Sequence, residues 1–161
     1  MTPAHGTPGG RTPDSGPWRL PTATAEYVVA PSASGTGLDL VHWGARGSAW
    51  GHIAVEQTNV LTPTDVEPSE WTALGTRHVQ RAELVADLGD GLVGVLLRLD
   101  AVRVDRPGTT PGRHTLTARL VDTTGSLTVD LVVATDERHD VVLKHVVVEN
   151  TSATRTVRLS R

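Results

Sequence analysis

The chain has 161 residues, with 15 Lys and Arg against 18 Asp and Glu, and it contains no cysteine. This length suits one domain with a real core, and the formal charge of −3 argues against nucleic acid or an anionic membrane as a partner. Without cysteine there is no disulfide, no thiolate nucleophile and no cysteine-ligated zinc. No apolar stretch approaches the roughly 18 residues of a membrane span, and no signal-peptide core is found. We therefore expect a cytoplasmic protein with no cofactor and no metal.

The residue types available for a core predict an all-β chain. The sequence has 22 Val and 22 Thr against a single Ile and no Phe. These β-branched side chains fit a pleated, half-buried surface better than a helix.

The first 21 residues hold five prolines and four glycines, with Trp18 and Leu20 as their only large apolar side chains. Such a composition cannot offset the entropy of ordering. Residues 1–21 are therefore predicted to be a disordered tail, and residues 22–161 the folded domain. Strands are expected over residues 27–30 and 38–43, and in the second Leu38, Leu40 and His42 would share one face.

The middle of the chain is the least regular. Between residues 45 and 80 no hydrophobic period persists, and irregular chain with one short helix after Pro68 is expected. A strand of about eight residues follows from residue 93. Its apolar parity changes after Leu99, which predicts a β-bulge or a break in the strand near Asp100.

The last 46 residues alternate most clearly. Strands are predicted over residues 116–120, 127–133, 141–149 and 156–160, with turns at 122–125, 136–140 and 150–153. Four strands joined by tight turns predict an antiparallel meander, in which Val157 and Leu159 face inward. Because the sequence stops at Arg161 in the last strand pattern, we expect a polypeptide that is cut short.

Two segments carry a family resemblance. Residues 122–161 read DTTGSLTVDLVVATDERHDVVLKHVVVENTSATRTVRLSR, and residues 40–44 read Leu-Val-His-Trp-Gly. In their order and spacing they resemble the N-terminal β-domain of bacterial α-galactosidases of glycoside hydrolase family 36. Together they cover under a third of the chain.

The resemblance implies an incomplete antiparallel β-sandwich of the galactose-mutarotase kind, which precedes a (β/α)₈ barrel. Two carboxylates on that barrel would perform retaining glycoside hydrolysis, so no catalytic residue transfers to this chain. It also implies a homo-oligomer when the protein is complete, and a galactoside or another carbohydrate as partner of the full-length protein. Family members often have a Gly-Asp-Phe-Arg type motif near the sugar pocket, but residues 63–80 contain no such run.

Four aromatic or imidazole side chains are candidates for binding carbohydrate: His42, Trp43, Trp50 and Trp71. An aromatic face can stack on the C–H face of a sugar while a ring nitrogen reaches a hydroxyl. The alternative for Trp43 is packing in the sandwich or against a barrel, and for Trp50 and Trp71 packing beneath long loops. Packing is the favoured interpretation of all three tryptophans.

Other motifs have ordinary structural interpretations. Residues 89–94 spell G-x-G-x-x-G, but a Val/Leu strand follows in place of the helix of a dinucleotide site, so a hairpin turn is predicted. The His52–Glu56 and His139–His145 pairs lack a third metal ligand. His145 is expected to be a hydrogen-bonded core residue and His139 a solvated one.

The remaining carboxylate pairs and hydroxyls add no site. Glu67 with Glu70, and Asp136 with Glu137, are interpreted as ordinary polar turns. A serine-hydrolase elbow of G-x-S-x-G form is absent. The sequon at residues 150–152 has no meaning without secretion.

Three hypotheses follow. The first is the non-catalytic N-terminal domain of an α-galactosidase-like glycoside hydrolase, which supports barrel packing and oligomerisation. The second is a free-standing sugar-binding or mutarotase-like β-sandwich. The third is an interaction module of fibronectin-like build that ignores sugars.

Overall fold

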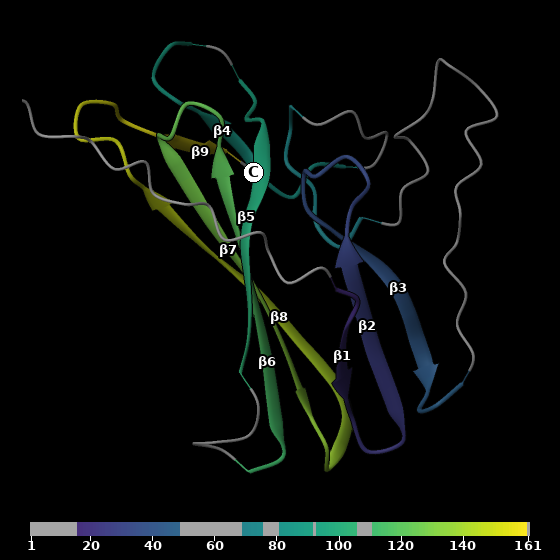
Figure 1. The fold of residues 1–161 in the computed structure, drawn as a ribbon. Coiled ribbons are helices and arrows are strands. Elements are labelled where there is room, and N and C mark those ends of the chain that lie inside the picture. The colour runs from purple at the N-terminus through teal and green to yellow at the C-terminus, as the bar shows by residue number, and fades with distance from the viewer. Residues whose placement is uncertain (1–15, 49–68, 76–80, 92, 106–110, 161) are drawn as a thin grey trace, which may run out of the picture.

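The computed structural model describes residues 16–48, 69–75, 81–91, 93–105 and 111–160, and these form β-strands without any helix or closed barrel (Figure 1). The strands are β1 (Trp18–Pro21), β2 (Ala25–Pro31), β3 (Leu38–Ala45), β4 (Val85–Asp87), β5 (Leu97–Asp105), β6 (Arg113–Asp122), β7 (Leu127–Asp136), β8 (His139–Asn150) and β9 (Arg158–Ser160). None of the described residues forms a helix that could cross a membrane.

The strands form three antiparallel sheets in two layers. One layer is the sheet β5-β6-β7-β8, and the other consists of the sheet β1-β2-β3 and the pair β4-β9. Figure 1 shows the small sheets beside opposite ends of the long one. This arrangement confirms the prediction of an all-β, antiparallel sandwich.

Two apolar clusters fill the space between the layers. The first joins Leu84, Ala86 and Leu88 to Leu97, Leu120, Leu127 and Val129. The second joins Leu20, Tyr27, Val29 and Leu38 to Leu116, Ala118, Leu131 and Val133. Trp71 and Leu99 pack against both clusters and so link them into one core. Each fully buried leucine or valine contributes about 1.5–3 kcal/mol relative to exposure.

The predicted bulge is present in β5. Leu99 pairs with Leu120 and Ala101 with Arg119, so Asp100 is the extra residue. This single insertion reverses the parity of the strand, because apolar side chains face the core at Leu97 and Leu99 before it and at Val102 and Val104 after it.

A second bulge, in β3, was not predicted. Val29 pairs with Leu40 while Val28 pairs with His42, which leaves Val41 as the extra residue. The alternation expected for residues 38–43 is therefore wrong beyond Leu40. Trp43, and not His42, shares the face of Leu40.

Three other expectations are corrected. Residues 18–21 were assigned to the tail, but they form β1, where pairing with β2 buries Leu20 completely. The helix after Pro68 is absent from residues 69–75, which instead form isolated bridges to β3 and Leu84. The last strand does not extend the meander, because residues 151–157 carry the chain to the other layer, where β9 pairs with β4.

The final strand also differs in its side chains. Val157 packs against the core as predicted, whereas Leu159 is 55% exposed. The expectation that both residues face inward is therefore wrong for Leu159. The remainder of the predicted tail, residues 1–15, lies outside the described residues.

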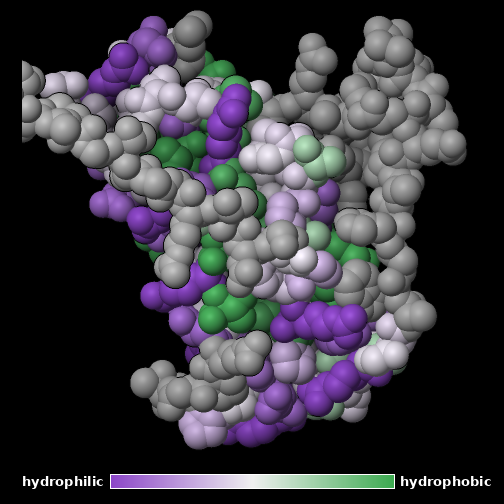
Figure 2. All heavy atoms as spheres, viewed as in Figure 1, coloured by the Kyte–Doolittle hydropathy of each residue, from purple (hydrophilic) through white to green (hydrophobic). Residues whose placement is uncertain are grey.

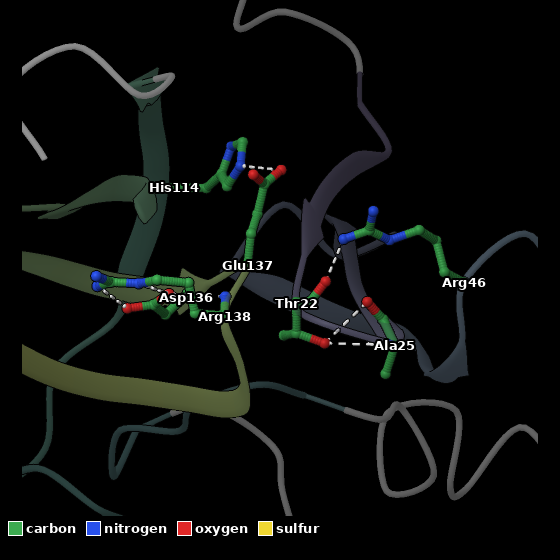
Figure 3. Close-up of polar contacts among 7 residues, drawn as sticks. All are labelled: Thr22, Ala25, Arg46, His114, Asp136, Glu137 and Arg138. Carbon is green, nitrogen blue, oxygen red and sulfur yellow. Dashed lines mark hydrogen bonds and ion pairs between the residues drawn. The ribbon is translucent and has the colours of Figure 1, made fainter. Parts of the chain in front are cut away.

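The turns at one end of the two layers gather polar side chains. Hydrophilic residues dominate the lower end of the face seen in Figure 2. Figure 3 shows three of these contacts: His114 Nε2 lies 3.0 Å from Glu137 Oε1, Arg138 Nη2 lies 2.8 Å from Asp136 Oδ2, and Arg46 donates to the carbonyl of Thr22. The His114–Glu137 contact connects the start of β6 to the β7–β8 turn, and the Arg46–Thr22 contact connects the end of β3 to the β1–β2 turn. The Arg138–Asp136 pair lies within the β7–β8 turn.

Candidate functional site

A buried carboxylate, Glu70, lies between the two layers. Its backbone N–H donates to the carbonyl of Leu38 at 2.7 Å, and the adjacent Ser69 forms an antiparallel bridge with Asp39. These backbone contacts hold residues 69–70 beside the start of β3. The Glu70 side chain, only 1% exposed, is thereby directed at β2 and β8.

Two donors from different layers bind this carboxylate. The Tyr27 hydroxyl on β2 donates to Glu70 Oε2, and Lys144 Nζ on β8 donates to Glu70 Oε1. Lys144 Nζ also lies 3.5 Å from the Tyr27 hydroxyl and 5.9 Å from the centre of its ring. A carboxylate removed from water requires such compensation, so this three-residue cluster is a polar link through an apolar core.

The cluster also controls the Tyr27 hydroxyl. Burial raises the pKa of Tyr27 far above its ordinary value, and the hydrogen bond to Glu70 and the negative charge of Glu70 raise it further. Tyr27 therefore stays protonated and acts as a donor. It cannot serve as a base at neutral pH.

A solvent-open hollow of about 200 Å³ adjoins the buried cluster. It lies between β8 and the neighbouring segments of the other layer, and its lining consists of Glu70, Trp71, Glu83, Leu131, Lys144, His145 and Val146. Glu83 forms two hydrogen bonds with the backbone of Thr72. Its side-chain Oε2 accepts from the Thr72 N–H at 3.2 Å, and its own N–H donates to the Thr72 carbonyl at 3.0 Å. An aromatic surface, carboxylates and an ammonium thus meet at one opening.

The predicted carbohydrate-binding residues that the structure describes, His42, Trp43 and Trp71, do not line one opening. Trp71 is half-buried and lines the hollow. Trp43 is 45% exposed and packs edge-on against Tyr27, with ring centroids 5.8 Å apart. His42 lies on the opposite face of β3, where its Nε2 is 3.1 Å from Ser48 Oγ. Trp50 lies outside the described residues.

His42 and Trp43 therefore do not form a common contact surface. The bulge at Val41 does not bring them together, since consecutive side chains of a strand point to opposite faces. Among the three described members of the predicted set, Trp71 is the one that lines the hollow.

Of the predicted histidine roles, the one for His145 is wrong. His145 was predicted to be a core residue, but it is exposed, because its register opposite Val132 places it on the outer face of β8. His139 is exposed, as predicted. His52, Glu56 and Glu67 lie outside the described residues. Within the described ranges, no three His, Asp or Glu side chains are grouped as metal ligands would be.

The glycine-rich segment forms the predicted hairpin turn. Asp87 and Val93 form an antiparallel bridge, and the Asp87 carboxylate accepts from the N–H groups of Gly89 at 2.8 Å and Gly91 at 3.3 Å. Both glycines have positive φ angles, which a tight turn of this kind requires.

Sequence reasoning missed the buried cluster itself. Glu70 was interpreted as part of a polar turn, and Tyr27 only as a strand residue. A signal was present in Lys144, the single lysine of the chain, which falls between Val142 and Val146 on the face of β8 that points toward the other layer. A charged residue at such a position predicts an opposite charge across the core.

A second polar link joins the layers at the turn end. Asp140, at the start of β8, accepts hydrogen bonds from the Thr22 and Thr24 hydroxyls, both at 2.7 Å, and from the N–H groups of Thr24 at 2.8 Å and Ala25 at 3.2 Å. The backbone N–H of Thr24, followed by the hydroxyls of Thr22 and Thr24, holds the pKa of Asp140 well below its usual range. The contact fixes the β1–β2 turn on β8.

We compared the chain with known protein families, protein sequences and solved structures. No protein-family model and no curated protein sequence matches the chain. Solved structures do match: α-galactosidase AgaA of Geobacillus stearothermophilus with a TM-score of 0.74 and 21% identity over 89% of this chain, AgaB of the same organism with 0.71 and 23% over 92%, and the Lactobacillus brevis α-galactosidase with 0.69 and 16% over 88%.

The matched region covers most of this chain but only a small part of each α-galactosidase. This chain spans only 23%, 23% and 22% of those three proteins. Likeness at such identities defines the architecture and leaves chemistry to be argued from residues. By fold, the chain corresponds to a β-sheet segment that makes up about a quarter of a GH36 α-galactosidase.

Proposed function

We propose that this chain is the non-catalytic N-terminal β-domain of an α-galactosidase-like glycoside hydrolase, and that it packs against a catalytic barrel and against other subunits. The structural match to GH36 α-galactosidases over 23% of their length supports this proposal more than any other observation. Structures of AgaA contain raffinose or stachyose, so a galactoside is the proposed substrate class of the full-length protein. The cytoplasm is the proposed compartment.

The surface of β8 supports a packing role. β8 is the edge strand of the four-stranded sheet, and its outer face presents Val141, Leu143 and Val147, which are about half exposed. An exposed edge that is also apolar favours association with another protein surface. Such a surface suits a domain that works inside a larger assembly.

Two measurements test the proposal. The purified chain should release no nitrophenol from a nitrophenyl α-galactoside. Turnover that survives repurification and is lost on Glu83→Gln would overturn a non-catalytic role.

The second measurement is light scattering, which should give a mass above that of a monomer for the wild-type chain. The double variant Leu143→Lys, Val147→Lys should lower this mass. Val93→Lys, at a position that is 61% exposed on another segment, is the matched control. A wild-type chain that is strictly monomeric would contradict packing through β8.

The second candidate function is that of a free-standing sugar-binding sandwich. The hollow at Trp71 favours it, because an aromatic side chain lies there among hydrogen-bonding groups. Titration with a galactoside separates the two candidates when it is combined with the association measurement.

A further inference from the structure

The hollow beside the buried cluster has the composition of a ligand site. We propose that it binds one pyranose ring of a neutral carbohydrate, with Trp71 as the stacking surface and Glu83 and Lys144 as the hydrogen-bonding groups. The proposal does not rest on the function proposed above, since it concerns residues of this chain alone.

Size limits the ligand to a single ring. The hollow measures about 200 Å³, which is smaller than the roughly 300 Å³ at which pockets for drug-sized molecules begin. An oligosaccharide would therefore place one ring inside and the rest in solvent. The floor of Leu131 and Val146, with Trp71 beside it, offers apolar surface to the C–H face of such a ring.

The polar groups suit hydroxyls better than a charged ligand. Lys144 and Glu70 neutralise each other, so Glu83 leaves the lining with an excess of negative charge, which disfavours phosphate and other anions. Donors and acceptors are both present. An ammonium has three donors, of which Lys144 directs one at Glu70 and a second, longer one at the Tyr27 hydroxyl. Glu83 accepts from Thr72 through Oε2, and its Oε1 is the proposed acceptor for a ligand hydroxyl.

The buried cluster makes the site preorganised. Glu70 is held by Tyr27 and by its own backbone contact to Leu38, and it fixes Lys144 at the rim of the hollow. A lysine that is already positioned loses less rotamer entropy when a ligand binds. Glu70 is thus a positioning residue, and Lys144 is the group that would touch the ligand.

The test uses methyl α-galactopyranoside and methyl α-glucopyranoside as probes, with saturation-transfer NMR and tryptophan fluorescence as readouts. For a ligand of this size, binding with a dissociation constant of about 1 mM is expected. Glu83→Gln should weaken binding about fivefold or more, because the exposed Glu83 carboxylate is the proposed acceptor for the ligand hydroxyls. His139→Ala, at an exposed position of β8 outside the hollow, should leave binding unchanged.

Each remaining outcome is decisive. Trp71→Ala should abolish binding, but Trp71 also packs on both core clusters, so circular dichroism must show that this variant is folded. Absence of saturation transfer from either glycoside, or binding that Glu83→Gln does not alter, would overturn the site. Binding of choline in preference to both glycosides would assign the hollow to an organic cation instead. None of these results would alter the association measurement that tests the proposed function.

Discussion

Lys144 donates a hydrogen bond to Glu70, which lies 74 residues earlier in the sequence. This contact joins β8 to the segment that precedes β4. The two partners differ in their surroundings, because the Glu70 side chain is 1% exposed and the Lys144 side chain 46% exposed. Loss of the ion pair should therefore cost more when it leaves the Glu70 carboxylate buried without Lys144 than when it leaves the Lys144 ammonium, which can be solvated by water.

This asymmetry predicts unequal effects of substitution. Lys144→Met leaves a buried carboxylate with Tyr27 as its remaining donor and should destabilise the chain by about 3 kcal/mol. Glu70→Gln should cost about 1 kcal/mol, since Gln still accepts from Tyr27 while the lysine turns to water. Urea unfolding of both variants and the double variant gives the coupling energy, and the double variant should cost less than the sum. Equal and additive losses would contradict the asymmetry.

Tyr27 predicts a feature of the alkaline pH profile. It is the single tyrosine of the chain, so phenolate absorbance reports it directly. Its pKa in the folded chain is raised by burial first and by the Glu70 hydrogen bond and charge next. The resulting stabilisation is complete below the unfolded value of about 10 and is lost as the pH rises from there toward the folded pKa.

The absorbance of Tyr27 should therefore not follow a simple titration centred on pH 10. The phenolate absorbance of Tyr27 should instead appear above pH 10, at the same pH at which the β-sheet circular dichroism signal is lost. Tyr27→Phe should be less stable at neutral pH but lose less stability between neutral pH and alkaline pH. A phenolate signal that develops at its ordinary pKa in a folded chain would show that Tyr27 is not buried.

Asp140 predicts the opposite, acidic dependence. Its pKa is lowered by the Thr24 N–H and by the Thr22 and Thr24 hydroxyls, so its stabilising contribution is present above the unfolded value of about 3.9 and is lost as the pH falls through the folded value. Asp140→Asn should be less stable than the wild type at pH 7, and the difference should shrink below pH 4. Glu149→Gln, an exposed carboxylate on the same strand, is the control and should show no such convergence.

The sequence was most informative where alternation decides the structure. The strands of β6, β7 and β8 and the bulge at Asp100 were predictable, because a period of two fixes the faces of half-buried strands and a reversal of parity demands an extra residue. The bulge at Val41 could not be predicted from a reversal of parity, because apolar residues occur on both faces of β3. The partner of β9 was equally hidden, because a strand of three residues carries almost no periodic signal.

The candidate site was harder to predict for a different reason. Its members come from β2, β8, residues 70–71 and Glu83, and no local spacing connects them. Trp71 was identified as a candidate by its residue type, whereas Glu70 looked like any carboxylate in a polar segment. Its burial follows from tertiary packing alone. A buried ionic link of this kind becomes visible only when the layers are assembled.

Gly75 permits a close backbone approach between residues 74–75 and Val95, which lies just before β5. It has a φ of +119°, and a Cβ atom there would lie 2.4 Å from the carbonyl oxygen of Val95, whose N–H donates to the carbonyl of Leu74 at 2.6 Å. Gly75→Ala therefore combines an unfavourable backbone angle with a clash against backbone, and it should destabilise the chain by about 3 kcal/mol or more. Gly35→Ala is the matched control. Gly35 also has a positive φ, +71°, but nothing lies within 4 Å of its added Cβ, so the cost should be about 1–2 kcal/mol. Urea unfolding of the two variants separates the clash from the backbone term, and equal losses would mean that Gly75 is required for its φ angle alone.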